Sequence, residues 1–260
     1  MPDAARDRLH GVTTIARRHG NTGKLASPLY RHEARLAATL YCAHSEPRTA
    51  PFIPYLFTDA FYEGVQNDAA ELIARVLHPN QVPTLTGLLS GRLEQFLTCT
   101  NPNCHHMRRT EGEDFSSLQL PLRDVSGILV TTVQAALDAH MPTETVHLDE
   151  CCPMCQAETD LNFNKTHLVT QFPRVLILSL NRWAGFGANN AILHSIDANR
   201  ALVFKDHRYQ LCAVVCHLGA SPHDGHYVTV ARHPTHHGEW WFYDDERRVI
   251  ATDKLTMDLH

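Results

Sequence analysis

Two groups of side chains in this sequence have types and spacings that suit chemistry, and the first is a histidine with a pair of carboxylates. His226 follows a glycine in the stretch GHYVTV, and Asp244 and Asp245 follow the aromatic run WWFY. A histidine held by a carboxylate is the usual general-base arrangement, because the carboxylate fixes the tautomer and the orientation of the imidazole. The structural alternative is a histidine at a strand end and two acidic residues that open a turn.

The second group is a set of closely spaced cysteines with turn-forming Asn and Pro residues between them. Two short pairs separated by a long insertion supply the four thiolates that hold a structural Zn²⁺ in tetrahedral geometry. The adjacent Cys151 leaves the register of the second pair open, and His105 or His147 can substitute for a thiolate. Buried thiols without a metal are the alternative. The predicted ligands are Cys99, Cys104, Cys152 and Cys155.

The other cysteines indicate no chemistry of their own. Cys212 and Cys216 share one face of an expected strand, separated by Val214, and are predicted to be core residues. Cys42 closes an expected helix and has no glycine turn before it. That context makes Cys42 a poor candidate for a nucleophile.

The composition is that of an ordinary globular protein. The 260 residues are 43% hydrophobic and 20% charged, with a net charge of −5 and no long basic run. This argues against nucleic acid or an anionic membrane as a partner. The N-terminal stretch MPDAARDRLHG lacks the apolar core of a signal peptide, and no apolar stretch reaches transmembrane length. Without a secretion signal we expect reduced thiols. We also expect a monomer, located in the cytoplasm, the nucleus or both.

Helices are expected before the cysteines. About the first 78 residues have a helical pattern, with one helix over 34–42 and another over 67–78. Asn67 or Asp68 caps the second helix, and Glu71 completes a capping-box pattern with Asp68. Its apolar residues fall on one face at helical spacing. They are Ala69, Leu72, Ile73, Val76 and Leu77.

Strands are expected after the cysteines. A short helix capped by Thr131 or Thr132 comes first, and β-branched and aromatic runs then alternate with turn formers. The run RVLILSL is almost entirely apolar, which is typical of a strand buried on both faces. Helices, a cysteine-bearing insertion and an antiparallel sheet together predict an α+β fold. The expected strands span 174–183, 209–219, 226–233, 239–245 and 247–253.

The order of these motifs resembles the ubiquitin-specific protease family of papain-like cysteine deubiquitinases. GVQNDAAELIARVL is similar to the family's Gln-Gln-Asp-Ala-x-Glu-Phe helix, and FPRVLILSLNRW to its Pro-x-x-Leu-x-(Ile/Leu)-x-Leu-x-Arg-Phe strand. The paired cysteines resemble the zinc ribbon of the family's fingers, and EDFSSLQLPL resembles the strand that follows the first pair. The stretch from Tyr209 to Val249 is similar to the histidine box. The resemblance covers residues from about 50 to the end.

This resemblance implies one catalytic domain over residues 1–260 with a papain-like cysteine protease fold. A partial helical thumb would cover 1–91, zinc-binding fingers 92–164, and an antiparallel β-sheet palm 165–260. The implied reaction is hydrolysis of the bond after the C-terminal glycine of ubiquitin. Ubiquitin or ubiquitinated proteins would be the partner, and a structural Zn²⁺ the cofactor.

The resemblance also implies residue roles. His226 would be the general base, Asp244 would orient its imidazole, and Asp245 would be an assisting carboxylate. The family positions that bind the substrate correspond to Asp68, Glu71, Gly225 and Tyr227.

The nucleophile is where this sequence departs from the family. The family box reads Asn-x-x-Gly-Asn-Thr-Cys-Tyr at the start of a helix, where the helix N-terminus and the histidine lower the pKa of the thiol. Residues 19–32 read HGNTGKLASPLYRH, so Gly23 stands at the cysteine position. Arg17 and Arg18 stand in the region of the asparagine that helps to build the oxyanion hole. The family spacing puts a normal box at or just before Met1.

Two explanations follow. Either the sequence starts downstream of a real box, which the intact His226 and Asp244 favour, or GNTG is a decayed box. The corresponding functions are a cysteine deubiquitinase that needs its upstream segment and a catalytically inactive ubiquitin-binding module. A zinc-stabilised interaction domain without a role in ubiquitin binding is a third interpretation. The sequence leaves open the linkage preference, the protein substrate, and whether the modifier is ubiquitin or a relative.

Overall fold

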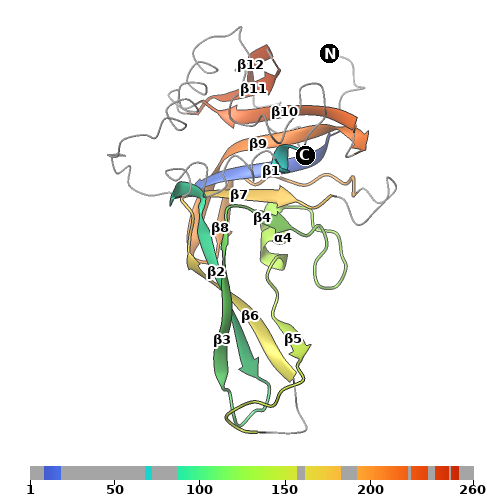
Figure 1. Cartoon of the computed structure of the whole chain (residues 1–260). Coiled ribbons are helices and arrows are strands. Elements are labelled where there is room, and N and C mark those ends of the chain that lie inside the picture. Colours follow the sequence, from blue (N-terminus) through green and yellow to red (C-terminus); the bar gives the residue numbers. More distant parts are fainter. Residues whose placement is uncertain are drawn as a thin grey trace, which may run out of the picture.

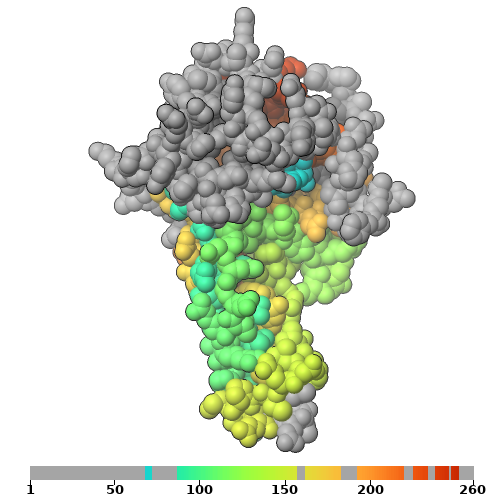
Figure 2. Space-filling view, in the orientation of Figure 1, coloured from blue at the N-terminus to red at the C-terminus, as the bar shows by residue number. Residues whose placement is uncertain are grey.

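The computed structural model describes residues 9–18, 68–71, 87–156, 162–182, 192–221, 224–233, 238–245 and 247–251. These residues build a palm sheet and a finger sheet that projects away from it (Figure 1). In the space-filling view the finger sheet forms a slender extension (Figure 2). Among the described residues no helix combines the length and the apolar character needed to cross a lipid bilayer.

The palm sheet has eight strands in the order β12-β11-β10-β9-β1-β7-β4, and β8 pairs with β9 outside that path. Neighbouring strands run antiparallel, except that β4 and β7 run parallel. The strands are β1 (Leu9–Arg18), β4 (Leu118–Leu120), β7 (Val175–Leu180), β8 (Ala201–Phe204), β9 (His207–Ser221), β10 (Asp224–Arg232), β11 (Trp240–Asp244) and β12 (Arg247–Ala251).

The finger sheet has four strands in the order β3-β2-β6-β5. The short helix α4 (Val133–Ala139) packs near β4 and β8, between the finger and the palm (Figure 1). Thr132 caps this helix, since its hydroxyl accepts a hydrogen bond from the Ala135 N–H at 3.0 Å. The finger strands are β2 (Gly91–Cys99), β3 (Met107–Phe115), β5 (Glu144–His147) and β6 (Asn162–Gln171).

The five strands predicted in the last third of the chain are confirmed as β7, β9, β10, β11 and β12. Five consecutive residues of β7, 176–180, are buried, as expected for a strand covered on both faces. The core around β7 also includes the fully buried Tyr209, whose hydroxyl donates to the Pro173 carbonyl at 2.8 Å. The described residues are mostly strands, so they bear out the sheet part of the predicted α+β fold.

Strand β1 corrects the prediction that the first 78 residues are helical. Leu9–Arg18 pairs with β7 on one side and with β9 on the other, in the middle of the palm sheet. The stretch Val12–Ile15 consists of β-branched residues, which favour an extended backbone over a helix. β7 and β9 offer an open strand edge on either side of these residues. Pairing with both edges supplies partners to the backbone N–H and C=O groups, which need them when buried. The helical prediction is wrong for these residues.

A proline in the centre of β1 is expected to split the palm sheet. Thr14 pairs with Leu178 on β7 and with Val214 on β9. Thr14→Pro removes a ladder hydrogen bond and puts the proline ring against a neighbouring strand. We expect the free energy of unfolding to fall by about 2–4 kcal/mol in urea denaturation. Thr14→Val keeps the ladder and should unfold near the unmodified midpoint. An unchanged midpoint for Thr14→Pro would contradict the central position of β1.

Some predictions fall on residues outside the described part. They concern the helix over 34–42, Cys42, the GNTG stretch at 20–23, and most of the helix over 67–78. Residues 69–71, at the start of the last helix, are helical, and the Asp68 carboxylate accepts a hydrogen bond from the Ala70 N–H at 2.6 Å. Asp68 is therefore confirmed as the cap, because its side chain satisfies an N–H that has no partner within the helix.

Candidate functional site

A histidine and an aspartate meet at one end of the palm sheet. His226 lies on β10 and Asp244 is the last residue of β11, with 2.6 Å between His226 Nε2 and Asp244 Oδ1. Their side chains are 41% and 36% exposed, so solvent reaches both. Asp245 belongs to the same group, in which the ligand atoms all lie within 4.8 Å of one another.

The strand register explains this contact. β10 and β11 pair from Arg232 opposite Trp240 to Thr229 opposite Tyr243, so the next residue of β11, Asp244, continues toward His226. Asp245 then turns with a φ of +47°, in the left-handed region where Asp is more common than most side chains. The turn ends β11 at the point where the carboxylate meets the imidazole.

The two ring nitrogens of His226 have different roles in this geometry. An ionised carboxylate can only accept, so His226 Nε2–H donates to Asp244 Oδ1. In the neutral ring Nδ1 then carries the lone pair. Nδ1 is therefore the nitrogen that can accept a proton from a nucleophile.

None of the described cysteines offers His226 a reactive thiol. Cys216 on β9 is fully buried, and burial raises the pKa of its thiol to about 12 despite the positive charge of Arg182. Such a thiol stays protonated at neutral pH and is a poor nucleophile. Cys212 lies at a bulge between β9 and β1 and is half-buried. The core prediction is confirmed for Cys216 and is only partly right for Cys212.

Position 225 requires glycine because it packs closely against a buried histidine. A Cβ at this position would lie 2.3 Å from His217 Nε2 and 2.8 Å from the carbonyl oxygen of Leu218. His217 is 6% exposed, and its ring centroid lies 4.8 Å from that of Tyr227. The glycine thus permits the close approach of β9 and β10 where their register shifts before His226. Sequence reasoning missed His217, because a single histidine within an apolar run carries no signal of its partners.

Gly225→Ala is expected to destabilise the palm and to disturb His226. The added methyl group meets both a ring and a backbone carbonyl, so the two strands must separate. We expect a loss of about 1–3 kcal/mol in urea denaturation and shifted His226 imidazole signals in NMR spectra. Gly87→Ala is a matched control, since a Cβ there meets nothing within 4 Å. Equal behaviour of the two variants would contradict this account of Gly225.

Tyr227 lies beside the start of the helix at 69–71. Burial raises the pKa of the Tyr227 phenol and the Asp68 carboxylate raises it further, while a hydrogen bond from the Ala69 backbone opposes both. Glu71 is exposed on the same turn. The structure thus brings two of the residues predicted to bind substrate, Asp68 and Tyr227, together at the face of β10.

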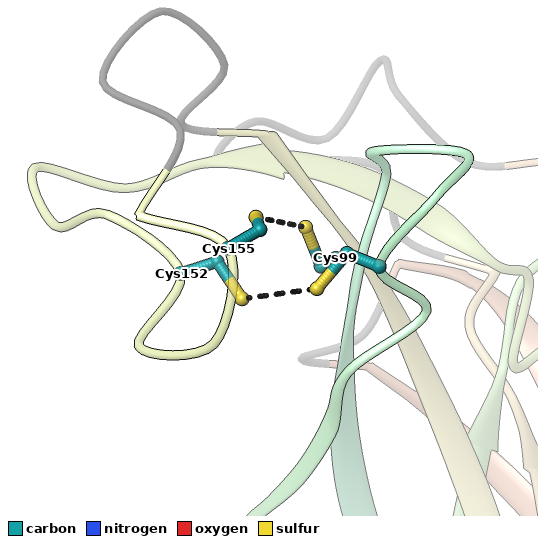
Figure 3. A group of neighbouring side chains, drawn as sticks. Cys99, Cys152 and Cys155 are labelled. Atoms are coloured by element: carbon teal, nitrogen blue, oxygen red, sulfur yellow. Dashed lines mark hydrogen bonds between the residues drawn. The ribbon is translucent and has the colours of Figure 1, made fainter.

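Four thiols gather at the tip of the finger sheet, as Figure 3 shows for the labelled Cys99, Cys152 and Cys155. The Sγ atoms of Cys99 and Cys155 are 3.8 Å apart, and those of Cys104 and Cys152 are 3.6 Å apart. All four lie within 4.8 Å of one another. A Zn–S distance of about 2.3 Å gives sulfur–sulfur separations of about 3.8 Å in a tetrahedral site. The cluster therefore fits a tetrahedral metal ion with little adjustment.

Backbone amides point at these sulfurs. Burial raises the pKa of Cys152, but hydrogen bonds from the backbones of Cys155 and Met154, together with those of the Cys104 and Cys99 side chains, bring the pKa to about 7. Burial raises the pKa of Cys99 to about 12, and a hydrogen bond from the Asn101 backbone opposes this. Hydrogen bonds from N–H groups stabilise a thiolate, which is the form of cysteine that binds metal.

The membership of the cluster also distinguishes between the alternative ligands of the predicted metal site. Cys152 is fully buried within it, whereas Cys151 is exposed and lies outside it. Neither His105 nor His147 belongs to the cluster, and His147 Nδ1 instead lies 3.3 Å from the Asn162 side-chain oxygen. The residues brought together are the four cysteines that the spacing predicted.

A buried arginine after β7 is a further feature, to which sequence reasoning gave no role. Arg182 is 2% exposed, and its Nη1 donates to the carbonyl oxygens of Ile192 at 3.0 Å and His194 at 2.8 Å. Burial lowers the pKa of its guanidinium. Arg182 thus holds residues 192–194 against the palm. Its partners are backbone carbonyls, which leave no trace in a sequence pattern.

Comparison with known proteins shows which family this chain resembles. Residues 38–257 match the sequence profile of the family described as ubiquitin carboxyl-terminal hydrolase. Ubiquitin carboxyl-terminal hydrolase 4 of Arabidopsis thaliana is 27% identical, over 56% of this chain and 40% of its own length. Ubiquitin carboxyl-terminal hydrolase 17-like protein D of Mus musculus is 25% identical, over 86% of this chain and 43% of its own. The chain spans less than half the length of these relatives.

Solved structures show the same fold. A chain of the SAGA DUB module bound to monoubiquitin matches with a TM-score of 0.59 and 20% identity, over 98% of this chain and 68% of that chain. A chain of the module bound to ubiquitin aldehyde matches with a TM-score of 0.56 and 19% identity, over 73% of this chain and 46% of that chain. At these identities the likeness concerns the fold alone.

Proposed function

The chain belongs to the ubiquitin carboxyl-terminal hydrolase family, and from this membership we propose that it binds ubiquitin and carries the base and orienter of a cysteine deubiquitinase. The proposed reaction is hydrolysis of the bond after the C-terminal glycine of ubiquitin. The observation that carries the catalytic part is the 2.6 Å contact between His226 Nε2 and Asp244 Oδ1.

In the proposed mechanism Asp244 keeps a proton on His226 Nε2, and Nδ1 takes the proton of a cysteine thiol. The thiolate attacks the carbonyl carbon of the terminal glycine of ubiquitin, and the imidazolium returns the proton to the leaving amine. His226 then activates the water that hydrolyses the thioester. Asp244 stabilises the imidazolium in both steps, and Asp245 adds negative charge nearby.

Strand pairing limits where this thiol can come from. His226 pairs with Leu218 on β9, and Leu218 pairs with Leu9 on β1. The chain therefore enters the palm sheet two strands away from the imidazole. Strands in a sheet are about 4.8 Å apart, so the backbone of Leu9 lies within about 10 Å of that of His226, and a segment joined to the chain ahead of Leu9 starts from this point. We infer that such a segment can carry the nucleophile.

Arg18, the last residue of β1 before the GNTG stretch, lies at the opposite end of that strand from Leu9. Arg18 pairs with Tyr209, which is nine residues along β9 from Leu218. At about 3.3 Å per residue this separation is about 30 Å. The five residues from Arg18 to Gly23 span at most about 18 Å. Covalent reach thus argues against Gly23 as the former position of the catalytic cysteine.

A structural Zn²⁺ at the cysteine cluster is the second part of the proposal. The sulfur–sulfur distances of 3.6 and 3.8 Å and the amides directed at the sulfurs support it. Cys99, Cys104, Cys152 and Cys155 would hold the ion and so join the two loops at the finger tip. When bound, the ion would supply a cross-link in a region whose own core is small.

A ubiquitin-binding module without catalysis is the second candidate function. It is favoured by the absence of a reactive thiol near His226 among the described residues, where Cys216 is buried and has a pKa of about 12. Both candidates share the ubiquitin-binding surface and differ only in the nucleophile.

Ubiquitin binding is expected whether or not the chain is catalytic. Titration of isotope-labelled ubiquitin with the chain should shift signals of the ubiquitin C-terminal tail, measured by NMR. Tyr227→Ala should weaken binding about tenfold, because a half-buried aromatic residue beside the Asp68 helix is a strong anchor. His233→Ala, directly after the last residue of β10, is the control. Unshifted tail signals at about 1 mM ubiquitin would contradict both candidate functions.

A further inference from the structure

We propose that His226, Asp244 and Asp245 also form a binding site for a divalent transition-metal ion of the zinc class, and that its occupancy switches off the base function of His226. One imidazole nitrogen and two carboxylate oxygens lie within 4.8 Å of one another at the end of the β10–β11 hairpin. This group is distinct from the four thiols at the finger tip. The binding part stands by itself, and the regulatory part rests on the proposed function.

The turn after β11 makes this donor set. Adjacent residues of a strand point to opposite faces of a sheet, so a continuous strand would separate the side chains of Asp244 and Asp245. The left-handed φ of +47° at Asp245 breaks this alternation and leaves both carboxylates near His226. One imidazole and two carboxylates with open positions for water suit Zn²⁺, Co²⁺ or Ni²⁺ better than a large cation that prefers oxygen ligands alone.

Only a small movement separates the observed pair from a metal-bound pair. Bonds of about 2.1 Å to nitrogen and oxygen at a tetrahedral angle put the two atoms about 3.4 Å apart. His226 Nε2 and Asp244 Oδ1 are now 2.6 Å apart. Both side chains are partly exposed and Asp245 is exposed, so the required adjustment does not disturb the core.

A metal ion on Nε2 changes which ring nitrogen carries the proton. The neutral imidazole now holds its proton on Nε2, toward Asp244. When the ion takes the Nε2 lone pair, this proton moves to Nδ1, with no net change in the number of protons on the ring. Nδ1–H is a donor and cannot accept the proton of a thiol. The ion therefore acts as a reversible inhibitor that a chelator removes.

Calorimetric titration of the zinc-loaded chain with ZnCl₂ tests the site. We expect the chain to bind a second equivalent of Zn²⁺. Because the chain has 19 histidines, substitutions are needed to show where this equivalent binds. His226→Gln and Asp245→Asn should weaken the second equivalent at least tenfold, and Asn also tolerates the left-handed backbone of position 245. His233→Gln and Glu239→Gln are matched controls at the other end of the same hairpin, and they should retain it.

A second equivalent that survives His226→Gln, or no second equivalent at all, would overturn the proposal. Ubiquitin titration of the same samples separates this outcome from failure of the proposed function. Ubiquitin binding without a second equivalent overturns the metal site alone. A second equivalent that depends on His226, in a chain that does not bind ubiquitin, supports the metal site and contradicts the function.

Discussion

Cys152→Ser is expected to release the metal from the finger tip and to unfold that tip while the palm sheet stays folded. A four-thiolate zinc site contributes on the order of 10 kcal/mol to local folding. Besides the cysteines, the tip has only a small buried core, with Leu97 and Phe163. Elemental analysis should show loss of zinc, and hydrogen exchange should rise across residues 95–160 without a matching change in β7, β9 and β10.

Cys151→Ser is the matched control for this experiment. Cys151 is the sequence neighbour of Cys152 but is exposed and lies outside the cluster. The control should keep its zinc and its pattern of hydrogen exchange. Equal zinc loss in the two variants would show that the register of the second pair is wrong. Less than about a tenth of an equivalent of zinc in the unmodified chain, purified without chelator, would remove the zinc proposal.

The second large effect concerns catalysis. The chain of 260 residues is expected to leave a ubiquitin-amide reporter uncleaved above background. A general base and its carboxylate cannot replace the group that attacks the carbonyl, and loss of a nucleophile costs roughly 10⁶-fold in such enzymes. Gly23→Cys should not restore cleavage, because the chain from Arg18 to position 23 spans at most about 18 Å, whereas the end of β9 that pairs with His226 is about 30 Å from the end that pairs with Arg18.

Fusion of a family Cys box ahead of Leu9 is the complementary experiment. It should create cleavage, because β1 begins two strands, or about 10 Å, from His226. The new activity should fall at least about 10⁴-fold with His226→Ala and about 10²-fold or more with Asp244→Ala. Cleavage by the unmodified chain that Cys42→Ser abolishes would instead identify Cys42 as the nucleophile.

Local patterns were enough to predict several parts of the fold. Three of them are local features: the apolar run of β7, the turn formers at the ends of the strands from β9 to β12, and the cap at Thr132. Each depends on interactions within a few residues, so the structure agrees with the sequence pattern there. The spacing of the two cysteine pairs likewise predicted the four thiols that cluster.

Other parts depend on contacts between residues far apart in the chain. The strand β1 forms because β7 and β9 both offer an open edge to Leu9–Arg18, which no local pattern reveals. The long finger strands β2, β3 and β6 carry many charged and polar residues, and their pairing compensates for weak strand patterns. Likewise, Gly225 is explained only by the approach of His217.

The sequence by itself determined which groups can do chemistry here, since residue type and spacing identify the histidine with its carboxylates and the four clustered cysteines. Only the tertiary structure decided which atoms meet. It selected Cys152 over Cys151, directed His226 Nε2 rather than Nδ1 to Asp244, and placed β1 in the palm sheet between β7 and β9. The reason is that strand register and turn conformation, which join distant segments, set distances that sequence spacing leaves free.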